Sequence, residues 1–274
     1  MQPTPVTAVG LLVALVGFAA LDRVRRAVSA AEDSTPTDGP RSIDLREHAW
    51  KWVIPAVLLL VVAAEGDSLA SIGWRVESPS VLLGQVLVGF GVLVGSHVLT
   101  APLWARVGDG GDSLAAGIGS FASLSTPERL FVAFTAGATE ETAFHGYALE
   151  RLLSLTGSAP LAGGLSAAAF VVGHAGDTWD RDAIRRIAQP ALVMTLLYLW
   201  FRSLPALIAI HALNDSLALL LADRFDDLAG DSDSDGENPD ASEAADSDAG
   251  NSDPDVADTS ADTDASSLAW LRGE

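Results

Sequence analysis

Two adjacent carboxylates and an imidazole lie within an apolar stretch in the second half of the chain. The stretch begins near Leu130 and reaches Glu140 and Glu141, and His145 follows four residues after the second carboxylate. Because a charged side chain at mid-membrane costs about 2.5 to 3.5 kcal/mol on insertion scales, the pair requires compensating partners or water. A carboxylate in such a pocket can act as a general base toward water. The alternative is that Glu141 pairs with His145 one turn later and merely joins helices.

Polar residues also interrupt two later apolar stretches. His174 closes one of them, with Phe170 one turn earlier on the same face. The last stretch holds His211 and Asp215 on one helical face, with Asn214 about 100° away around the helix. An imidazolium or amide donor in a low-dielectric site stabilises developing negative charge. The sequence therefore predicts one polar cavity that is shared by Glu140, Glu141, His174, His211 and Asp215.

Membrane-spanning helices are expected to position these residues. A hydrocarbon core about 30 Å thick needs about 17 to 25 mainly apolar residues per helix. The apolar stretches predict an all-α fold, a polytopic transmembrane helical bundle of about seven spans, or eight. The spans are expected at residues 6–21, 49–64, 80–105, 128–153, 158–175, 186–202 and 204–222. Tryptophan side chains prefer the membrane interface, so tryptophans near the expected helix ends support these boundaries. They are Trp50, Trp52, Trp74, Trp104 and Trp200.

Two local patterns concern a helix start and helix packing. The fourth span begins at Ser125, followed by Pro127 in the first turn and Glu128 where the helix dipole favours an acid. His97, inside the third span, is expected to form a hydrogen bond between packed helices, and we assign it no role in chemistry.

Basic residues indicate how the chain is oriented in the membrane. They gather after the first span and before the sixth, namely Arg23, Arg25, Arg26, Arg41, Arg46, Lys51, Arg181, Arg185 and Arg186. Positively charged connections stay on the cytoplasmic side, which predicts a multi-pass protein of the cell membrane with its N-terminus outside and its C-terminal tail inside. No basic residue precedes the first span, so we expect a signal anchor and not a cleaved signal peptide.

Composition divides the chain into three parts. Residues 223–274 contain 17 of the 36 acidic residues and few large apolar side chains, so we expect a disordered acidic tail. Residues 1–124 are expected to hold the N-terminal spans and 125–222 the core that carries the polar residues. A single Lys among 16 basic residues, with the acidic excess, is typical of a halophile's protein. The chain has no Cys, which excludes disulfides and thiol chemistry.

Residues 125–222 resemble the CPBP family, which contains the type II CAAX prenyl endopeptidases and the bacteriocin-immunity (Abi) proteins. The family has the motifs Glu-Glu-x-x-x-Arg, Phe-x-x-x-His and His-x-x-x-Asn/Asp on successive membrane helices. In this chain the motifs begin at Glu140, Phe170 and His211 and end at His145, His174 and Asp215.

The resemblance implies a glutamate- or metal-dependent endopeptidase that hydrolyses a peptide bond within the membrane. Glu140 would activate a water molecule, His174 would assist, and the third motif would stabilise the oxyanion. The implied substrate is a membrane-associated protein or peptide, prenylated or not, and the other partner is the lipid bilayer. No nucleic-acid partner is expected, because the chain has neither a phosphate-binding loop nor a basic aromatic surface.

Two departures from the motifs leave roles open. His145 replaces the family's Arg, so a side chain that titrates stands where the family has a permanent cation. An ionised Asp215 cannot donate to an oxyanion, so it could orient His211 while Asn214 supplies the donor. The site could instead hold a metal, with zinc bound by His174, His211 and Glu140 and one open position.

Two other functions would fit some of the same residues. A proton-coupled transporter would also place carboxylates at mid-membrane, but such proteins usually show two related halves, and this sequence does not. A non-catalytic membrane scaffold or immunity protein would keep the helices without needing three motifs in register.

Overall fold

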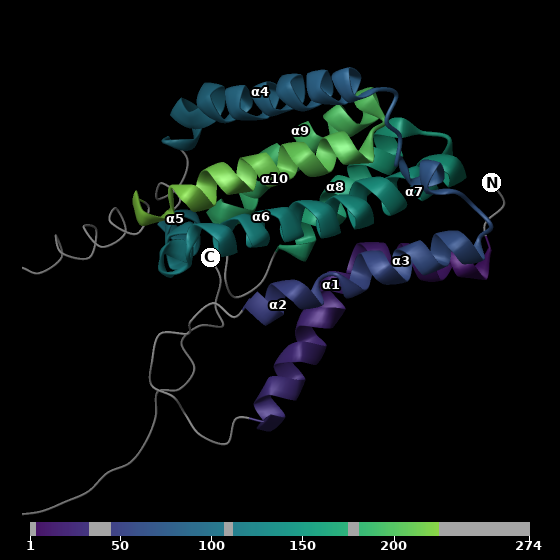
Figure 1. The fold of residues 1–274 in the computed structure, drawn as a ribbon, viewed down its shortest axis with the longest axis horizontal. Coiled ribbons are helices and arrows are strands. Elements are labelled where there is room, and N and C mark those ends of the chain that lie inside the picture. The colour runs from purple at the N-terminus through teal and green to yellow at the C-terminus, as the bar shows by residue number, and fades with distance from the viewer. Residues whose placement is uncertain (1–3, 33–44, 107–111, 175–180, 225–274) are drawn as a thin grey trace, which may run out of the picture. The chain divides into compact units, whose positions relative to one another are not determined.

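A computed structural model describes residues 4–32, 45–106, 112–174 and 181–224, and all regular elements in these ranges are helices. The all-α prediction is confirmed. Figure 1 shows several of the longer helices lying alongside one another. The acidic tail predicted for 223–274 lies outside the described residues from position 225 onward.

The first part of the chain forms an antiparallel helix pair. α1 (Pro5–Glu32) packs against α3 (Val53–Ala64), and the short α2 (Leu45–Trp50) leads into α3 through a turn at Lys51 and Trp52. A 3₁₀ turn, η1 (Leu69–Ile72), follows. α4 (Pro79–Trp104) then starts at Ser78, whose hydroxyl accepts a hydrogen bond from the Val81 amide at 3.2 Å.

The second part forms the centre of the bundle. α5 (Asp112–Gly119) and the 3₁₀ turn η2 (Ser120–Ser123) precede a long rod made of α6 (Thr126–Glu141), the π-helical segment η3 (Thr142–Leu149) and α7 (Glu150–Thr156). α8 (Ala159–Gly173), α9 (Arg181–Phe201) and α10 (Leu204–Leu220) complete it. α10 packs against α6 and α4, α8 packs against α9 and η3, and α1 packs against η3.

The predicted start of the fourth span is confirmed by its hydrogen bonds. The backbone amide of Ser125 donates to Glu128 Oε2 at 2.8 Å, which closes a capping box at the first turn of α6. The other end of the rod is also defined, because Gly157 follows α7 with a φ of 65°, where a side chain would be strained.

The predicted spans are confirmed only in part. Within the described ranges, three segments are long and apolar enough to cross a membrane: Pro5–Val28, Leu45–Ala64 and Pro79–Trp104. The four later stretches are helices as expected, but they are shorter or carry several charged residues. α5 and η2 form a short apolar helical segment that the sequence did not predict as a separate element.

Buried ion pairs tie distant parts of the described chain together. Glu65, the first residue after α3, accepts hydrogen bonds from Arg151 at 2.7 and 3.1 Å and from the Tyr147 hydroxyl at 3.0 Å. The side chains of Glu65 and Arg151 are 0% and 3% exposed. Glu150 is held in a similar way by Tyr198 at 2.7 Å and Arg202 at 2.6 Å, which joins α7 to the end of α9.

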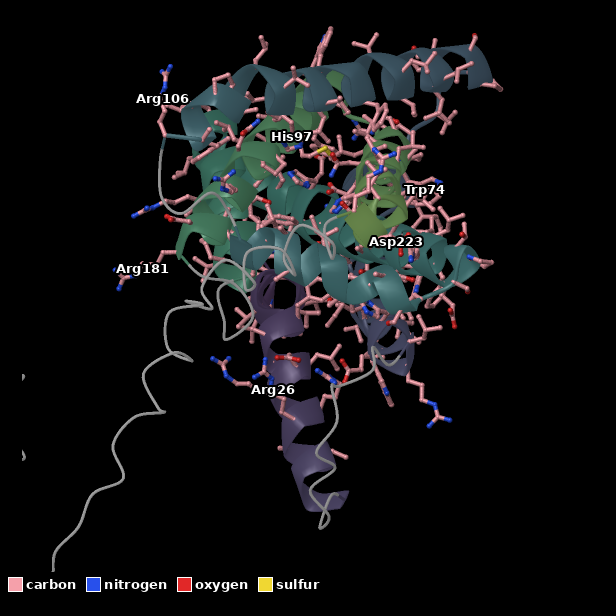
Figure 2. All side chains as sticks on the ribbon, turned by 90° about the vertical axis from the view of Figure 1, so that its left-hand side faces the viewer. Arg26, Trp74, His97, Arg106, Arg181 and Asp223 are labelled. Carbon is pink, nitrogen blue, oxygen red and sulfur yellow. The ribbon has the colours of Figure 1, made fainter. Side chains whose placement is uncertain are left out.

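A third ion pair closes the opposite end of α6. Arg129 donates to both oxygens of Asp223, at 2.8 and 2.9 Å, and to the carbonyl of Leu219. These hydrogen bonds lower the pKa of the Asp223 carboxyl below its ordinary value. Asp223 is labelled in Figure 2, which also shows Arg106 and Arg181 pointing outward at the periphery.

The contact between α6 and α10 depends on Gly137. A Cβ at this position would lie 3.0 Å from the Ala212 amide nitrogen and 3.1 Å from the Ile208 carbonyl oxygen, both of them backbone atoms of α10. Small residues allow membrane helices to approach this closely.

We expect Gly137→Ala to destabilise the protein by about 1 to 3 kcal/mol, the usual cost of overpacking, because α10 must move away from α6. Gly91→Ala is the matched control, since a Cβ at Gly91 in α4 meets no atom within 4 Å. The control should be neutral, or stabilising by up to about 1 kcal/mol through helix propensity. Unfolding in mild detergent measures both, and equal effects would contradict the close-packing argument.

The ion pair at Glu65 predicts a loss of stability in acid. Burial alone would raise the pKa of the Glu65 carboxyl, but hydrogen bonds from Arg151, Thr7 and Tyr147 together hold it below the ordinary value of 4.5. A carboxyl whose pKa is lower in the folded state stabilises the fold above about pH 4.5, and this contribution is lost as the pH falls through the folded value.

Glu65→Gln should therefore destabilise the protein at neutral pH, by about 3 to 5 kcal/mol, since it leaves a buried Arg151 poorly compensated. Its unfolding free energy should also fall less steeply than that of the wild type between about pH 5 and pH 3, a range that includes the ordinary pKa of 4.5. Glu77→Gln, which changes an exposed carboxylate, should retain the wild-type slope. A variant curve parallel to that of the wild type would contradict the assignment.

Candidate active site

The two adjacent carboxylates lie at the C-terminal end of α6, where the rod passes into the π-helical segment η3. Glu140 is 6% exposed and Glu141 is 1% exposed, so both side chains are buried in the protein. Consecutive helical side chains point about 100° apart. The two carboxylates therefore face different neighbours, and π-helical segments such as η3 are frequent at functional sites.

Glu140 faces the α2–α3 turn and the end of α8. Its Oε1 accepts a hydrogen bond from Lys51 Nζ at 2.9 Å, and its Oε2 lies 3.8 Å from His174 Nε2. The second distance exceeds a direct hydrogen bond and suits a bridge through a water molecule. One oxygen of this carboxylate is thus held by a cation, while the other faces an imidazole.

The second motif positions His174 through its own backbone. His174 Nδ1 lies 2.9 Å from the Phe170 carbonyl oxygen, which can only accept, so Nδ1 carries the proton. The imidazole also lies against the Phe170 ring, with a centroid distance of 4.5 Å. These contacts fix the ring so that Nε2 faces Glu140, which gives a physical role to both named positions of the Phe-x-x-x-His pattern.

Glu141 lies between two histidines. Its Oε1 is 2.6 Å from His211 Nδ1 and its Oε2 is 2.6 Å from His145 Nδ1. The second contact lacks the alignment of a hydrogen bond, so it is an electrostatic contact between two buried atoms that have no other hydrogen-bond partner. Both oxygens of Glu141 are therefore occupied by imidazole groups from η3 and α10.

The other ring nitrogen of His145 contacts Thr195. Thr195 Oγ1 lies 3.0 Å from His145 Nε2 and 2.8 Å from the Ala191 carbonyl oxygen, and its one hydroxyl proton can be donated to either of them. His145 can therefore turn an Nδ1–H toward Glu141 either as the imidazolium or as the neutral tautomer that is protonated at Nδ1. A lone pair on Nδ1 would be repelled by the carboxylate oxygen at 2.6 Å.

His211 also faces a carboxylate on its other side. Its Nε2 lies 3.3 Å from Asp215 Oδ2, and Asp215 Oδ1 accepts from Asn214 Nδ2 at 3.2 Å. Asn214 in turn forms a hydrogen bond with His97 of α4. Figure 2 shows His97 beneath α4, on the side that faces the rest of the bundle. The expected helix-packing role of His97 is confirmed, and its partner belongs to the third motif.

The residues predicted to share one cavity form two connected groups. Glu140 and His174 form the first, and Glu141, His211 and Asp215 form the second, with the peptide unit between Glu140 and Glu141 joining them. Asn214 contacts Asp215 and lies further out. In the described ranges no group of three or more His, Cys, Asp or Glu side chains is arranged to hold a metal ion.

Three residues that contact the site are not identified as part of it by the sequence. From the sequence, Lys51 indicates only how the chain is oriented in the membrane, His97 indicates only helix packing, and nothing marks Thr195. The sequence carries one signal for Lys51, since it is the only lysine in a chain whose other basic residues are all arginine. His97 and Thr195 have no such signal, because a single polar residue in an apolar helix is common.

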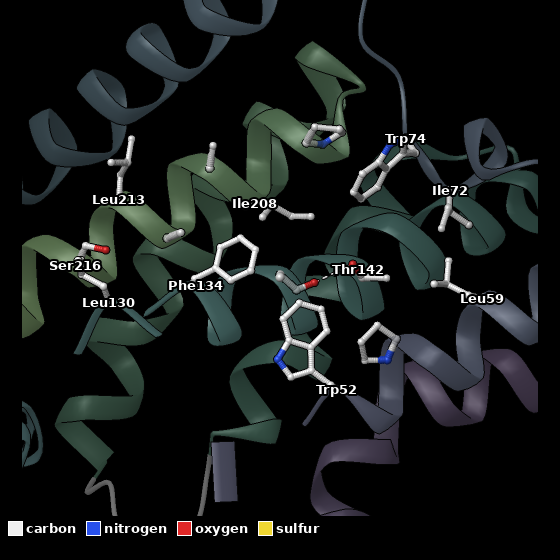
Figure 3. A pocket seen from close by; sticks show the side chains of 15 residues that line it. Trp52, Leu59, Ile72, Trp74, Leu130, Phe134, Thr142, Ile208, Leu213 and Ser216 are labelled. Atoms are coloured by element: carbon white, nitrogen blue, oxygen red, sulfur yellow. Dashed lines mark hydrogen bonds between the residues drawn. The ribbon is translucent and has the colours of Figure 1, made fainter. Parts of the chain in front are cut away.

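An apolar pocket adjoins the same part of α6 on another side. Its volume is about 740 Å³, and it lies between α3, α6 and α10 with Trp74 at its edge. Figure 3 shows Trp52, Phe134 and Ile208 projecting into it. Ala138, two residues before Glu140, and Thr142, directly after Glu141, also line it. The pocket can accommodate hydrocarbon but offers few polar groups.

A model of the family described as type II CAAX prenyl endopeptidase Rce1-like matches residues 122–217. This segment contains all three motifs and excludes Lys51 and His97. Searches among curated proteins and among solved structures found no match. The resemblance stated from the motifs is confirmed, and residues 122–217 form a domain of the Rce1-like type II CAAX prenyl endopeptidase family.

Proposed function

We propose that the protein is an intramembrane endopeptidase that hydrolyses a peptide bond of a membrane-associated protein or peptide. One observation carries the proposal: the buried Glu140 keeps one carboxylate oxygen 3.8 Å from His174 Nε2, at a distance a single water can bridge. The family of residues 122–217 supports the same reaction class.

In the proposed reaction Glu140 Oε2 takes a proton from a water molecule that also contacts His174. The water oxygen forms a bond to the scissile carbonyl carbon, and the carbonyl electrons move onto its oxygen. When the tetrahedral intermediate collapses, the carbon–nitrogen bond breaks and Glu140 returns its proton to the leaving amine. Glu140 thus acts first as general base and then as general acid.

The second group of residues would stabilise charge rather than move the first proton. Glu141 has both oxygens committed to His145 and His211, so it is poorly suited to abstract a proton from water. His211 lies between the carboxylates of Glu141 and Asp215, an arrangement that suits an imidazolium. Its Nε2 contact with Asp215, at 3.3 Å, is longer than its Nδ1 contact with Glu141, at 2.6 Å. We propose that His211 donates to the developing oxyanion and that Asp215 orients it.

A zinc site built from His174, His211 and Glu140 was the alternative expectation. His211 contacts Glu141 and Asp215, while His174 and Glu140 face one another. We therefore route no step of the proposed reaction through a metal. Activity that is lost in chelator and restored by zinc would require a different mechanism.

We further propose that the rod and the later helices cross the membrane, which gives seven spans in total. The rod from Thr126 to Thr156 is about 45 Å long at the usual helical rise, enough to cross the hydrocarbon core. Its interior charged residues are all buried in the protein, so its lipid-facing surface can remain apolar. These residues are Arg129, Glu140, Glu141, Glu150 and Arg151. The N-terminus would lie outside, and the basic connections and tail inside.

The apolar pocket favours a lipid-modified substrate, because a hydrocarbon chain could occupy it while the peptide reaches Glu140. Purified protein should be tested on one fluorogenic peptide in farnesylated and unmodified forms, with and without chelator. Cleavage of neither form would favour the scaffold or immunity alternative. Proton-coupled uptake in vesicles without cleavage would favour the transporter.

Glu140→Gln should lower peptide cleavage by about 100- to 10,000-fold, the usual contribution of a general base. The amide keeps the shape and polarity of the side chain but cannot take a proton from water. Thermal unfolding should show that the variant is folded, and retained turnover would exclude Glu140 as the base. Glu141→Gln should be milder, because its proposed role is to hold two histidines. Equal losses in both variants would contradict this division of roles.

A charged imidazole at His145 would hold Glu141 as the family's arginine would, and only a protonated imidazole carries that charge. If this is its role, activity should fall at alkaline pH, because the arrangement of Glu141 and His211 should relax when the charge is lost. His145→Arg should flatten this alkaline limb, because arginine keeps its charge. pH–rate profiles of wild type and variant on one peptide measure the difference.

Two controls make the His145 experiment decisive. Thermal unfolding checks that the larger Arg side chain fits a site where His145 is 1% exposed. A folded but inactive His145→Arg would instead favour a direct role in proton transfer. Full activity with an unchanged profile in His145→Ala would leave His145 only a packing role.

A further inference from the structure

The only lysine of the chain lies at the candidate active site. Lys51 belongs to the α2–α3 turn, 89 residues before Glu140, and its Nζ donates to Glu140 Oε1 at 2.9 Å. The Lys51 side chain is 32% exposed and the Glu140 side chain 8%. The contact therefore joins a partly accessible ammonium to a buried carboxylate. It also lies outside the matched domain, which begins at residue 122.

The turn that carries Lys51 is fixed to α6 at a second point. The indole Nε1 of Trp52 donates to Thr135 Oγ1 at 3.2 Å, and Thr135 is fully buried. The backbone of the turn is also ordered, because the Lys51 amide donates to the His48 carbonyl at 3.1 Å. Two consecutive side chains thus attach the turn to α6, which leaves the ammonium little freedom to leave Glu140.

The choice of lysine has a geometric consequence. Arginine presents a planar fork that commonly binds both oxygens of a carboxylate, whereas an ammonium is a compact point charge. Lys51 occupies Oε1 alone and leaves Oε2 toward His174. The other 15 basic residues of the chain are arginines, which favour bidentate binding of a carboxylate. Lys51 is the one that does not.

We propose that Lys51 is a positioning residue for the proposed peptidase reaction, holding Glu140 ionised through one oxygen and leaving the other for water. The inference rests on the proposed function. It also supplies a cation to Glu140 in a chain that has His145 where the family motif has arginine.

Several other groups act on Glu140 and are common to all variants compared. His174 faces it from α8 at 3.8 Å, His211 of α10 is near enough for its charge to act on it, and Glu141 is its neighbour in α6. Only differences between variants therefore report on Lys51.

Lys51→Met removes the charge while keeping much of the side-chain length. The acidic limb of the pH–rate profile, where the general base becomes protonated, should move to higher pH by about 1 to 3 units, the usual effect of an adjacent opposite charge. Lys51→Arg should keep the acidic limb in place but lower the maximal rate, because its fork competes for Oε2. Arg181→Met controls for the loss of one positive charge at an exposed position.

An unchanged acidic limb in folded Lys51→Met would overturn the proposal. A wild-type maximal rate in Lys51→Arg would contradict the argument that the cation must leave Glu140 Oε2 free. A purely structural role would lower the rate of both variants without moving either limb.

A second measurement does not depend on cleavage. Reductive methylation with ¹³C-formaldehyde retains the positive charge and labels one side chain in addition to the N-terminal amine, since the chain has one lysine. The NMR signal of methylated Lys51 should change with pH in the wild-type protein as Glu140 titrates, and this change should vanish in Glu140→Gln. Identical titrations in the two proteins would overturn the contact. A difference between them without cleavage of any peptide would preserve the ion pair and refute the peptidase function.

Discussion

The structure depends on the cost of placing charged side chains inside an apolar helical bundle. A buried carboxylate or guanidinium is tolerated only when another charge or several hydrogen bonds replace the water it loses. In the described residues each buried charge of the rod has such a partner from a distant part of the chain. Glu65 holds Arg151, Arg202 holds Glu150, and Asp223 holds Arg129. These pairs fix the ends of the rod. The carboxylates near its middle, Glu140 and Glu141, instead contact one lysine and three histidines.

Close packing makes the central contacts possible. Gly137 lets α10 approach the backbone of α6, which brings His211 within 2.6 Å of Glu141. The same rod reaches α8 through η3, where Ser166 donates to the Phe144 carbonyl at 2.6 Å. The carboxylates thus lie where three packed helices meet, and their geometry follows from backbone distances as much as from their own side chains.

The sequence predicted the parts of the site that depend on local geometry. Helical spacing placed His211 and Asp215 on one face, and the pattern from Ser125 to Glu128 located the start of α6. Both follow from interactions within one or two turns. The contact of Lys51 with Glu140 was not predictable in this way, because it spans 89 residues and depends on how α2 and the turn after it pack beside α6. The π-helical segment η3 was also missed, since no local residue pattern marks it.

Two adjacent glutamates can take different roles because a helix separates their directions. A rotation of about 100° turns Glu140 toward the α2–α3 turn and α8, and Glu141 toward η3 and α10. Glu140 meets one cation on one oxygen and keeps the other oxygen near an imidazole that its own backbone contact has oriented. Glu141 meets an imidazole on each oxygen and has none left for water. The difference arises from what surrounds each carboxylate and not from the carboxylates themselves. Shifting the register of α6 by one residue would place Glu141 among the neighbours of Glu140, and Glu140 at the place of Thr139. The contacts of η3, which follows Glu141 directly, help to hold the register that makes Glu140 the candidate base.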